Sequence, residues 1–361
     1  MRRVLEKRIG NKAVINGKNV IVFSSNDYLG LSAHPAVVNT AMSIADQFGI
    51  GTGGAPGTTG TTYIHVNLAN VVANFKSRNT AVIFPSGYQA NVSLHQALSD
   101  KNVVFYLDNR SHPSAVDGAW NRGGADVQRF DHRDLPSLEN AIKSNSDKTN
   151  IVSLPSVFTV DGDIAPLDKL SKLKNDLGFV LILDEAHATG VMGETGHGLE
   201  EHFNLPNTAD FIMGTFSKAI GSQGGFVTYN KDSQKYLKSG FRGFDYSTSL
   251  ATLAAAAALK AFDVLENDKL LLESLRNSKQ IIINKCRQKG INIIARESMI
   301  MLIPCVKIHD LVNVLIDEGY FTVPVKALID GVSTECLRIT PMALHTEFHI
   351  NGFVESLKKY I

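Results

Sequence analysis

The stretch Phe179-Val-Leu-Ile-Leu-Asp-Glu-Ala-His187 decides the fold of this chain. Its first five residues are apolar without a break, and Asp184 follows them directly. A strand that is apolar along its whole length is typical of a sheet that is buried on both faces. Ligands of such sheets bind beyond the carboxyl ends of the strands, so Asp184 and His187 are candidate site residues.

Further short apolar runs recur on both sides of this stretch, and the segments between them are long enough for helices. This alternation predicts an α/β fold with a mainly parallel sheet flanked by helices. Polar residues also follow these runs, namely Asp108 with His112, and Ser217 with Lys218, so several strands deliver polar groups to one edge of the sheet. The runs are Ala81–Phe84, Val103–Leu107, Ile151–Leu154 and Phe211–Met213.

A change of amino-acid composition near residue 251 indicates a domain boundary. The segment Ala251–Phe262 is rich in alanine and predicts a connecting helix. The remaining chain mixes charged helical segments with short strands such as Met299–Ile303. We therefore predict an N-terminal segment (1–45) that packs with a small C-terminal domain (256–361), and a large domain at 46–255.

Composition excludes several classes of function. Lysine and arginine number 36 against 35 aspartates and glutamates, so a net charge of +1 provides no field to attract nucleic acid or an anionic membrane. A phosphate on a ligand must then be held by local groups. No apolar run approaches the ~20 residues of a membrane span, and three cysteines without CxxC spacing indicate neither disulfides nor a metal site. We expect a cytoplasmic protein.

The strongest single motif is Gly214-Thr-Phe-Ser-Lys-Ala-Ile-Gly-Ser-Gln-Gly-Gly225. A lysine just past a buried strand can be partly desolvated, which favours the neutral amine that forms Schiff bases. Thr215 and Ser217 can hydrogen-bond a phosphate, and the glycines let the backbone approach a ligand. A surface lysine in a glycine-rich loop explains the motif equally well in isolation.

Three other motifs carry candidate groups. Asp184 can hold a pyridinium nitrogen in its protonated form, with His187 within reach of the same ligand, although a metal site or a helix cap remains open. Pro85-Ser-Gly-Tyr-Gln-Ala-Asn91 predicts a helix N-terminus whose N–H groups bind phosphate, although such junctions are common in α/β folds. His112 can stack on a flat cofactor, or it is simply a solvated loop histidine.

Arg338 lies in the apolar segment Cys336-Leu-Arg-Ile-Thr-Pro-Met-Ala-Leu-His345. A buried guanidinium without a partner is costly. A substrate carboxylate would supply a bidentate partner. An internal salt bridge is the alternative.

Taken together and in this order, the motifs resemble the α-oxoamine synthase family of fold-type I pyridoxal-phosphate enzymes. The resemblance runs from about residue 23 to the C-terminus. It implies a seven-stranded, mainly parallel sheet and a smaller α+β domain joined by the N-terminal segment. Besides the motifs above, it rests on Asn26–Leu31 with His34-Pro35, Gly51–His65, Ser111–Ser114, Val160–Leu167, Tyr246–Ser249 and Leu337–Thr340.

The resemblance implies a role for each motif residue. The cofactor would be pyridoxal 5′-phosphate (PLP), with Lys218 as Schiff-base lysine, Asp184 at the ring nitrogen, His112 stacked on the ring and His187 at the ring oxygen and the thioester carbonyl. Arg338, with Asn26 nearby, would receive the carboxylate of the amino acid. Phosphate ligands would be Ser86, Gly87, Tyr88, Thr215 and Ser217, with Thr248 reaching the phosphate of a neighbouring subunit in a homodimer.

The implied reaction is a Claisen condensation of a small amino acid with an acyl thioester, usually with loss of carbon dioxide. Lys218 would remove the α-proton of the amino acid. The loop Ala55–Thr61 lacks the arginine that is usual in the family, and Pro155-Ser156 stands where a Glu-Gly pair is common. Aldol cleavage or transamination on the same scaffold, and a silent partner subunit, are the alternatives; the presence of Lys218 argues against the last.

Overall fold

The computed structural model describes residues 3–120, 123–329 and 331–361. By its internal contacts the chain divides into two compact units. The larger unit comprises residues 35–158 and 164–264, and the smaller unit comprises residues 1–34, 159–163 and 265–361. The last boundary between the units, at residues 264 and 265, lies within helix α9 (Thr252–Asn267). The division into an N-terminal segment (1–45), a large domain (46–255) and a small domain (256–361) stays a prediction.

The larger unit is built on a seven-stranded sheet in the order β4-β10-β9-β8-β7-β5-β6. All neighbouring pairs are parallel except those of β10, which runs antiparallel to both β4 and β9. The predicted mainly parallel, seven-stranded sheet is confirmed. Its strands are β4 (Thr80–Phe84), β5 (Val103–Asp108), β6 (Asp126–Phe130), β7 (Thr149–Pro155), β8 (Val180–Asp184), β9 (Phe211–Thr215) and β10 (Gly225–Tyr229).

Two strands of this sheet, β6 and β10, do not correspond to any of the predicted apolar runs. β6 carries the polar sequence Asp-Val-Gln-Arg-Phe and lies at the edge of the sheet, where it pairs only with β5. Only Phe130 of its five residues is buried, so the strand needs few apolar side chains. β10 begins inside the glycine-rich motif, and its buried residues follow directly on Gly225.

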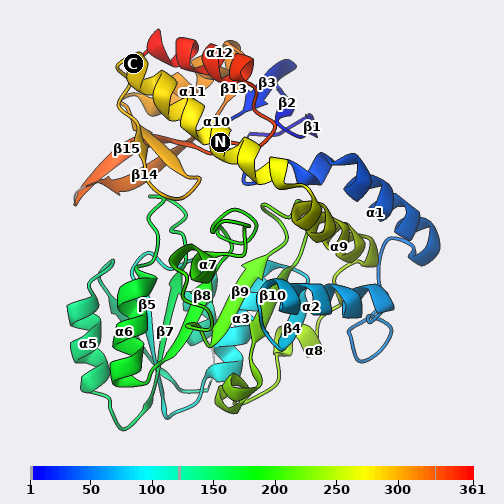
Figure 1. Cartoon of the computed structure of the whole chain (residues 1–361), viewed down its shortest axis with the longest axis vertical. Helices are drawn as coiled ribbons and strands as arrows, with labels where there is room; N and C mark the ends of the chain where they lie inside the picture. The colour runs from blue at the N-terminus through cyan, green and yellow to red at the C-terminus, as the bar shows by residue number, and fades with distance from the viewer. Residues whose placement is uncertain (1–2, 121–122, 330) are drawn as a thin grey trace. The chain divides into compact units, whose positions relative to one another are not determined.

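The core of the larger unit lies between the sheet and its helices. Every residue of β5, β8 and β9 is buried, as expected for strands covered on both faces. Helix α3 contributes Ala90, Leu94 and Leu98 to one face, and α5 and α6 lie side by side (Figure 1). The helices are α1 (Pro35–Phe48), α2 (Tyr63–Phe75), α3 (Gly87–Leu98), α4 (Pro113–Trp120), α5 (Leu135–Lys143), α6 (Leu167–Leu177), α7 (Leu199–Phe203), α8 (Arg242–Asp245) and the 3-10 helix η2 (Lys231–Tyr236).

In its described residues the smaller unit combines two four-stranded sheets with the α-helices α10, α11 and α12 and the 3-10 helix η1. One sheet has the order β1-β2-β3-β13, and the other has the order β11-β12-β15-β14. The elements are β1 (Lys7–Ile9), β2 (Lys12–Ile15), β3 (Lys18–Val22), η1 (Leu31–Ala33), α10 (Lys269–Gln288), β11 (Ile294–Ala295), β12 (Met301–Pro304), α11 (Ile308–Asp317), β13 (Tyr320–Phe321), β14 (Val323–Ile329), β15 (Val332–Ile339) and α12 (Glu347–Lys358). This is the predicted smaller α+β part of the fold.

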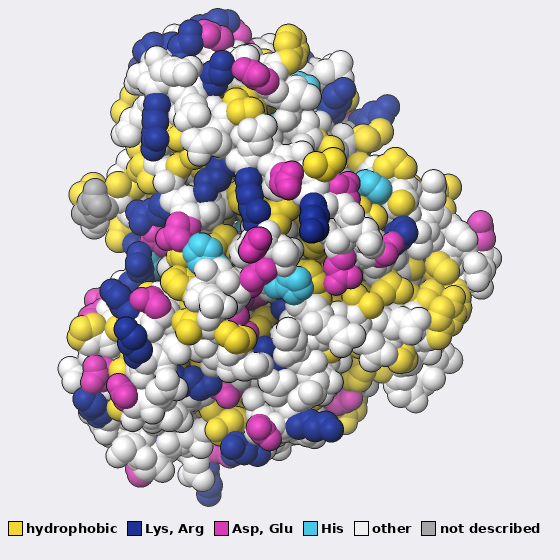
Figure 2. Space-filling view, viewed as in Figure 1, with side chains coloured by type: hydrophobic (Ala, Val, Ile, Leu, Met, Phe, Trp, Pro, Cys, Tyr) yellow, Lys and Arg dark blue, Asp and Glu magenta, His cyan; other side chains and the backbone are white. Residues whose placement is uncertain are grey.

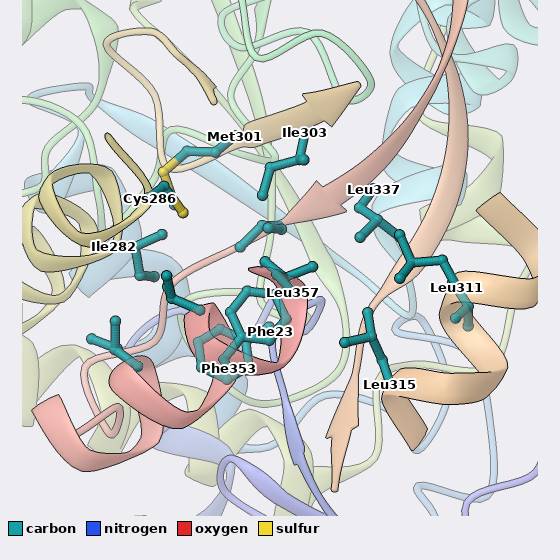
Figure 3. Packing of buried hydrophobic residues seen from close by; sticks show 14 of the residues in the cluster. Phe23, Ile282, Cys286, Met301, Ile303, Leu311, Leu315, Leu337, Phe353 and Leu357 are labelled. Atoms are coloured by element: carbon teal, nitrogen blue, oxygen red, sulfur yellow. The ribbon is translucent and has the colours of Figure 1, made fainter. Parts of the chain in front are cut away.

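Its core joins the N-terminal strands to the C-terminal helices. Figure 3 shows Phe23 beside Phe353, with Ile282 and Cys286 of α10 and Leu337 of β15 around them. The rings of Phe23 and Phe353 are stacked with centroids 4.1 Å apart. Segments separated by more than 300 residues therefore share one apolar cluster, and the N-terminal strands belong to the smaller unit.

Charged side chains of both signs are interspersed on the visible face in Figure 2, in line with the net charge of +1. In the described parts of the chain, no helix is both long and apolar enough to cross a membrane. Cys286, Cys305 and Cys336 are all free thiols.

Candidate active site

Strand register places the polar motif residues of the larger unit at one edge of the sheet. Gly225, the first residue of β10, pairs with both Phe84 and Thr215, which are the last residues of β4 and β9. Asp184 ends β8 and pairs with Met213 of β9. The motifs that follow β4, β8 and β9 therefore begin at the same edge, as predicted from the runs of apolar residues.

The turn after β9 holds Lys218 on a hydrogen-bonded frame. Thr215 is buried, and its hydroxyl donates to the carbonyl of Gly224 at 2.8 Å. The same oxygen accepts from the backbone N–H of Ser217 at 3.2 Å and lies 2.8 Å from the Ser217 hydroxyl. Lys218 is half-buried, and its carbonyl accepts from Gly221. A partly desolvated lysine beside two hydroxyls is the arrangement expected of a Schiff-base lysine with a phosphate site.

Asp184 is nearly buried, with 9% of its surface exposed. Oδ1 accepts from the backbone N–H of Ala186 at 3.0 Å, and Oδ2 accepts from Nδ2 of Asn91 at 3.0 Å. Each oxygen thus has one neutral donor and keeps capacity for another. Such a carboxylate can hold a protonated ring nitrogen through a charge-assisted hydrogen bond. His187, three residues later in the same turn, is also buried.

His112 follows β5 and lies close enough to Asp184 and Lys218 to feel both charges. Burial is the largest influence on its pKa and lowers it; the charge of Asp184 raises it, and the charge of Lys218 lowers it. The net shift of the pKa is downward. His112, Asp184 and Lys218 are therefore brought together, as the stacking role requires.

The start of α3 forms a close-fitting cradle beside this turn. Ser86 caps the helix by accepting from the N–H of Gln89 at 3.1 Å. A Cβ on Gly87 would lie 3.0 Å from Cβ of Thr215. The backbone N–H groups at this end point along the helix axis, where an anion is favoured. Helix end, Thr215 and Ser217 together fit the phosphate of PLP without a basic side chain.

Two further residues of the predicted cofactor site lie on the exposed surface of the larger unit. Tyr88 is 48% exposed, and its hydroxyl is hydrogen-bonded to Asp117, which raises its pKa. Thr248 is also exposed, in the segment after α8. The preceding Tyr246 is 77% exposed. Ser249 of the same segment packs on the loop 51–61, because its N–H donates to Gly54 at 3.0 Å.

Arg338 and Asn26 contact each other within the smaller unit. Both terminal nitrogens of Arg338 donate to Oδ1 of Asn26, at 3.3 and 3.2 Å, and Nε donates to the carbonyl of Thr159 at 2.9 Å. The side chain is buried, with 6% of the residue exposed. Within residues 3–120, 123–329 and 331–361 no carboxylate forms an ion pair with it. The alternative of an internal salt bridge is therefore not what this structure contains.

Residues without an assigned role in the sequence analysis complete the site. Asn91 and Ser114 link Asp184 to His112 through hydrogen bonds. Glu185, between Asp184 and His187 in sequence, forms a buried ion pair with Lys76. Asn91 was visible only as the end of the α3 motif, one helical turn after Gly87. Nothing in the local sequence indicates its partners, which come from strand β8 and helix α4.

Known proteins resemble the chain over nearly its full length. The aminotransferase class I and II family model matches residues 18–357. An 8-amino-7-oxononanoate synthase from Lysinibacillus sphaericus is 32% identical over 97% of this chain and 90% of its own. A serine palmitoyltransferase from Bacteroides thetaiotaomicron is 31% identical, covering 99% of this chain and 91% of its own.

Solved structures agree with this assignment. The serine palmitoyltransferase of S. paucimobilis, with PLP and myriocin bound, has a TM-score of 0.92 and 26% identity, and the match covers 99% of this chain and 92% of that chain. The cradle and the carboxylate described above fit the same cofactor. The chain therefore belongs to the aminotransferase class I and II family, and within it is a PLP-dependent enzyme of the α-oxoamine synthase type.

Proposed function

We propose that the enzyme condenses glycine, alanine or serine with an acyl thioester of coenzyme A or of acyl carrier protein, and that carbon dioxide usually leaves. The observation that carries this proposal is the common sheet edge. Asp184, Thr215 and the turn with Lys218 lie there, with His112 within their electrostatic reach. Relatives that are about 30% identical include two different α-oxoamine synthases, which supports the reaction class and leaves the choice of substrate to experiment.

The roles proposed for the residues follow from their surroundings. PLP, when bound, supplies an electron sink that lets the α-carbon of an amino acid lose a proton. Lys218 would hold the cofactor and then, as a neutral amine, accept that proton. Asp184 would accept a hydrogen bond from the ring nitrogen, His112 would stack on the ring and His187 would donate to the ring oxygen and the thioester carbonyl. Arg338 and Asn26 would bind the carboxylate of the amino acid.

The bond changes of the reaction balance without a further reagent. A bond forms between the α-carbon of the amino acid and the carbonyl carbon of the thioester. The carbon–sulfur bond breaks, and the thiol leaves with the electron pair and a proton. In the decarboxylating case the bond between the α-carbon and the carboxylate then breaks and releases carbon dioxide, and the α-carbon takes up a proton.

A homodimer with shared active sites forms part of this proposal. Thr248 would reach the phosphate in the neighbouring subunit, and its exposure in the single chain supports this role. Exposed apolar side chains on and around α1 and α2 offer a surface for such an interface; they are Met42, Ile50, Tyr63 and Val66. Light scattering of the purified protein would show twice the mass of 39.2 kDa. A cytoplasmic location stays a prediction.

Thiol release tests the proposed reaction. The PLP-loaded enzyme is mixed with glycine, alanine or serine and with a panel of acyl-coenzyme A and acyl carrier protein thioesters of increasing chain length. We expect thiol release with one amino acid only, and a loss of about 10²- to 10⁴-fold in Lys218→Ala, because a positioned general base contributes about that much. Release without any amino acid would contradict the proposal. Stoichiometric keto acid would favour transamination, and an inactive homomer would favour a silent subunit.

A further inference from the structure

A chain of hydrogen bonds begins at Asp184 and runs through the interior of the larger unit. Asn91 of α3 is completely buried, and its Nδ2 lies 3.0 Å from Oδ2 of Asp184 and 3.0 Å from Oγ of Ser114. A carboxylate can only accept hydrogen bonds, so the amide must turn its NH₂ group towards Asp184. The two hydrogens of Nδ2 then fill the two contacts, and Asn91 is the donor in both.

Ser114 must pass its own hydrogen on to His112. Its oxygen accepts from Asn91, and its remaining neighbour is Nδ1 of His112 at 2.7 Å. The backbone N–H of Ser114 also donates to Nδ1 of His112, at 3.3 Å. With two donors directed at it, Nδ1 has no room for a proton of its own. The proton of the neutral ring must then be on Nε2.

We propose that Asn91 and Ser114 are positioning residues that hold His112 as the neutral Nε2–H tautomer while they fix the carboxylate of Asp184. The direction of each of these hydrogen bonds is fixed, because Asp184 determines the orientation of the Asn91 amide and the amide determines the orientation of the Ser114 hydroxyl. Water cannot compete for these hydrogen bonds, since Asn91 and Ser114 expose only 0% and 1% of their surfaces. The tautomer follows from these contacts alone, whereas its value to the reaction rests on the proposed function.

A neutral imidazole of His112 could stack on a protonated cofactor ring without repulsion between like charges. A charged imidazolium against a protonated pyridine ring would place two positive charges face to face, which is unfavourable in a partly buried site. The Nε2–H of the neutral ring still offers a donor to an anionic substrate group. The charged groups that act on His112 are Asp184, Lys218 and Asp117, and the balance with burial lowers its pKa, in agreement with a neutral ring.

Nuclear magnetic resonance of protein labelled with ¹⁵N-histidine tests the tautomer directly. Long-range ¹H–¹⁵N spectra are recorded from pH 6 to pH 9, without PLP and with PLP bound, and His112→Gln assigns the signals. We expect Nδ1 to be unprotonated and Nε2 to carry the proton in both forms. A proton on Nδ1 of His112 would overturn the proposal. The spectra of the protein without PLP do not depend on the proposed reaction, so the two can fail separately.

Ser114→Ala tests the chain of donors. Loss of the hydroxyl removes the shorter of the two hydrogen bonds to Nδ1, while the backbone N–H at position 114 is retained. The pKa of His112 should therefore rise by about half to one unit, and the share of the tautomer with a proton on Nδ1 should increase. Ser93→Ala is the matched control, because Ser93 is a buried serine of α3 that accepts from Gly243 at 3.1 Å and has no contact with His112. An unchanged tautomer and pKa in folded Ser114→Ala, or an equal shift in Ser93→Ala, would refute the positioning role.

Discussion

Lys76 and Glu185 form an ion pair of which only 1% of either side chain is exposed. Glu185 lies next to Asp184 in the chain, and Lys76 follows helix α2. The lysine also donates to the carbonyl of His197 at 2.6 Å, and Oε1 of Glu185 accepts from the N–H of Leu199 at 2.7 Å. The pair therefore anchors the turn that carries Asp184 and His187 to the chain that leads into α7.

Removal of one partner of this pair should destabilise the enzyme strongly. We expect Lys76→Met to lower the free energy of unfolding by about 3–5 kcal/mol, because Glu185 would remain charged or have to bind a proton in the interior. Urea unfolding of the PLP-free protein measures the change. A matched control is Lys260→Met, which removes a lysine whose side chain is 35% exposed from its pair with Asp263 and should change the free energy by less than about 1 kcal/mol.

The double variant Lys76→Met/Glu185→Leu separates the charge from the packing. With both charges removed, the loss of stability should be smaller than in Lys76→Met alone. A double variant that is less stable than Lys76→Met would mean that the hydrogen bond from Leu199 to Glu185, and not the ion pair, anchors the turn.

Gly87→Ala should weaken PLP binding more than it weakens the fold. A Cβ at this position would lie 3.0 Å from Cβ and 3.1 Å from Oγ1 of Thr215, so the helix end or the threonine must shift. We expect the dissociation constant for PLP, measured by absorbance titration, to rise about 10- to 100-fold, as for the loss of one hydrogen bond to a charged group. Gly51→Ala is the control, because no atom lies within 4 Å of its added Cβ. Equal affinity in both variants would contradict the proposed cradle.

Arg338→Lys should affect the amino acid more than the chemical step. Lysine cannot reproduce the planar fork that donates to Asn26 and Thr159 and that would bind a carboxylate at two points. We expect KM for the amino acid to rise by about 10- to 100-fold with a smaller change in kcat. Arg296→Lys in the same unit, at the partly exposed pair with Asp163, should leave KM unchanged. A fall in kcat at constant KM would assign Arg338 a different role.

His345 should make the enzyme less stable in acid. Burial lowers the pKa of His345 to about 4, and its ring accepts from the N–H of Met342 at 3.0 Å and contacts the carbonyl of Val22 at 3.0 Å as a neutral group. The unfolded chain binds this proton near the ordinary pKa of about 6.5, so stability is complete above that pH and falls towards pH 4. The loss should reach about 3 kcal/mol.

A comparison of variants can show whether His345 causes the loss of stability at low pH. In urea unfolding between pH 4.5 and 8, His345→Gln should show a smaller loss of stability in acid than the wild-type enzyme, because glutamine does not titrate there. His309→Gln, at an exposed histidine of α11, should retain the full loss. If His345→Gln and the wild-type enzyme lost stability in parallel, the acid sensitivity would have to come from other groups, such as the buried His95, whose pKa burial also lowers to about 4.

Several elements could be predicted from local sequence, and others could not. The apolar runs at 103–107 and 179–183 are found as strands within one residue of their predicted ends, because full burial on both faces requires an unbroken apolar sequence. β6 was missed, since only one of its five residues is buried and the strand therefore carries polar side chains. The smaller unit also contains the segment 159–163, which lies inside the predicted large domain and which no compositional change reveals.

The sequence by itself determined the sheet type, the cofactor class and the identity of the residues at the ends of the strands. Those properties can be inferred from short continuous motifs, because an unbroken apolar run indicates a buried strand and the residues that follow it lie at the end of that strand. Only the tertiary structure decided which groups hold the site in place: Asn91 meets Asp184 across 93 positions of sequence, and Lys76 meets Glu185 across 109. A buried polar group needs a hydrogen-bond partner. Which group becomes that partner depends on which strands and helices pack together, and this packing cannot be inferred from the local sequence.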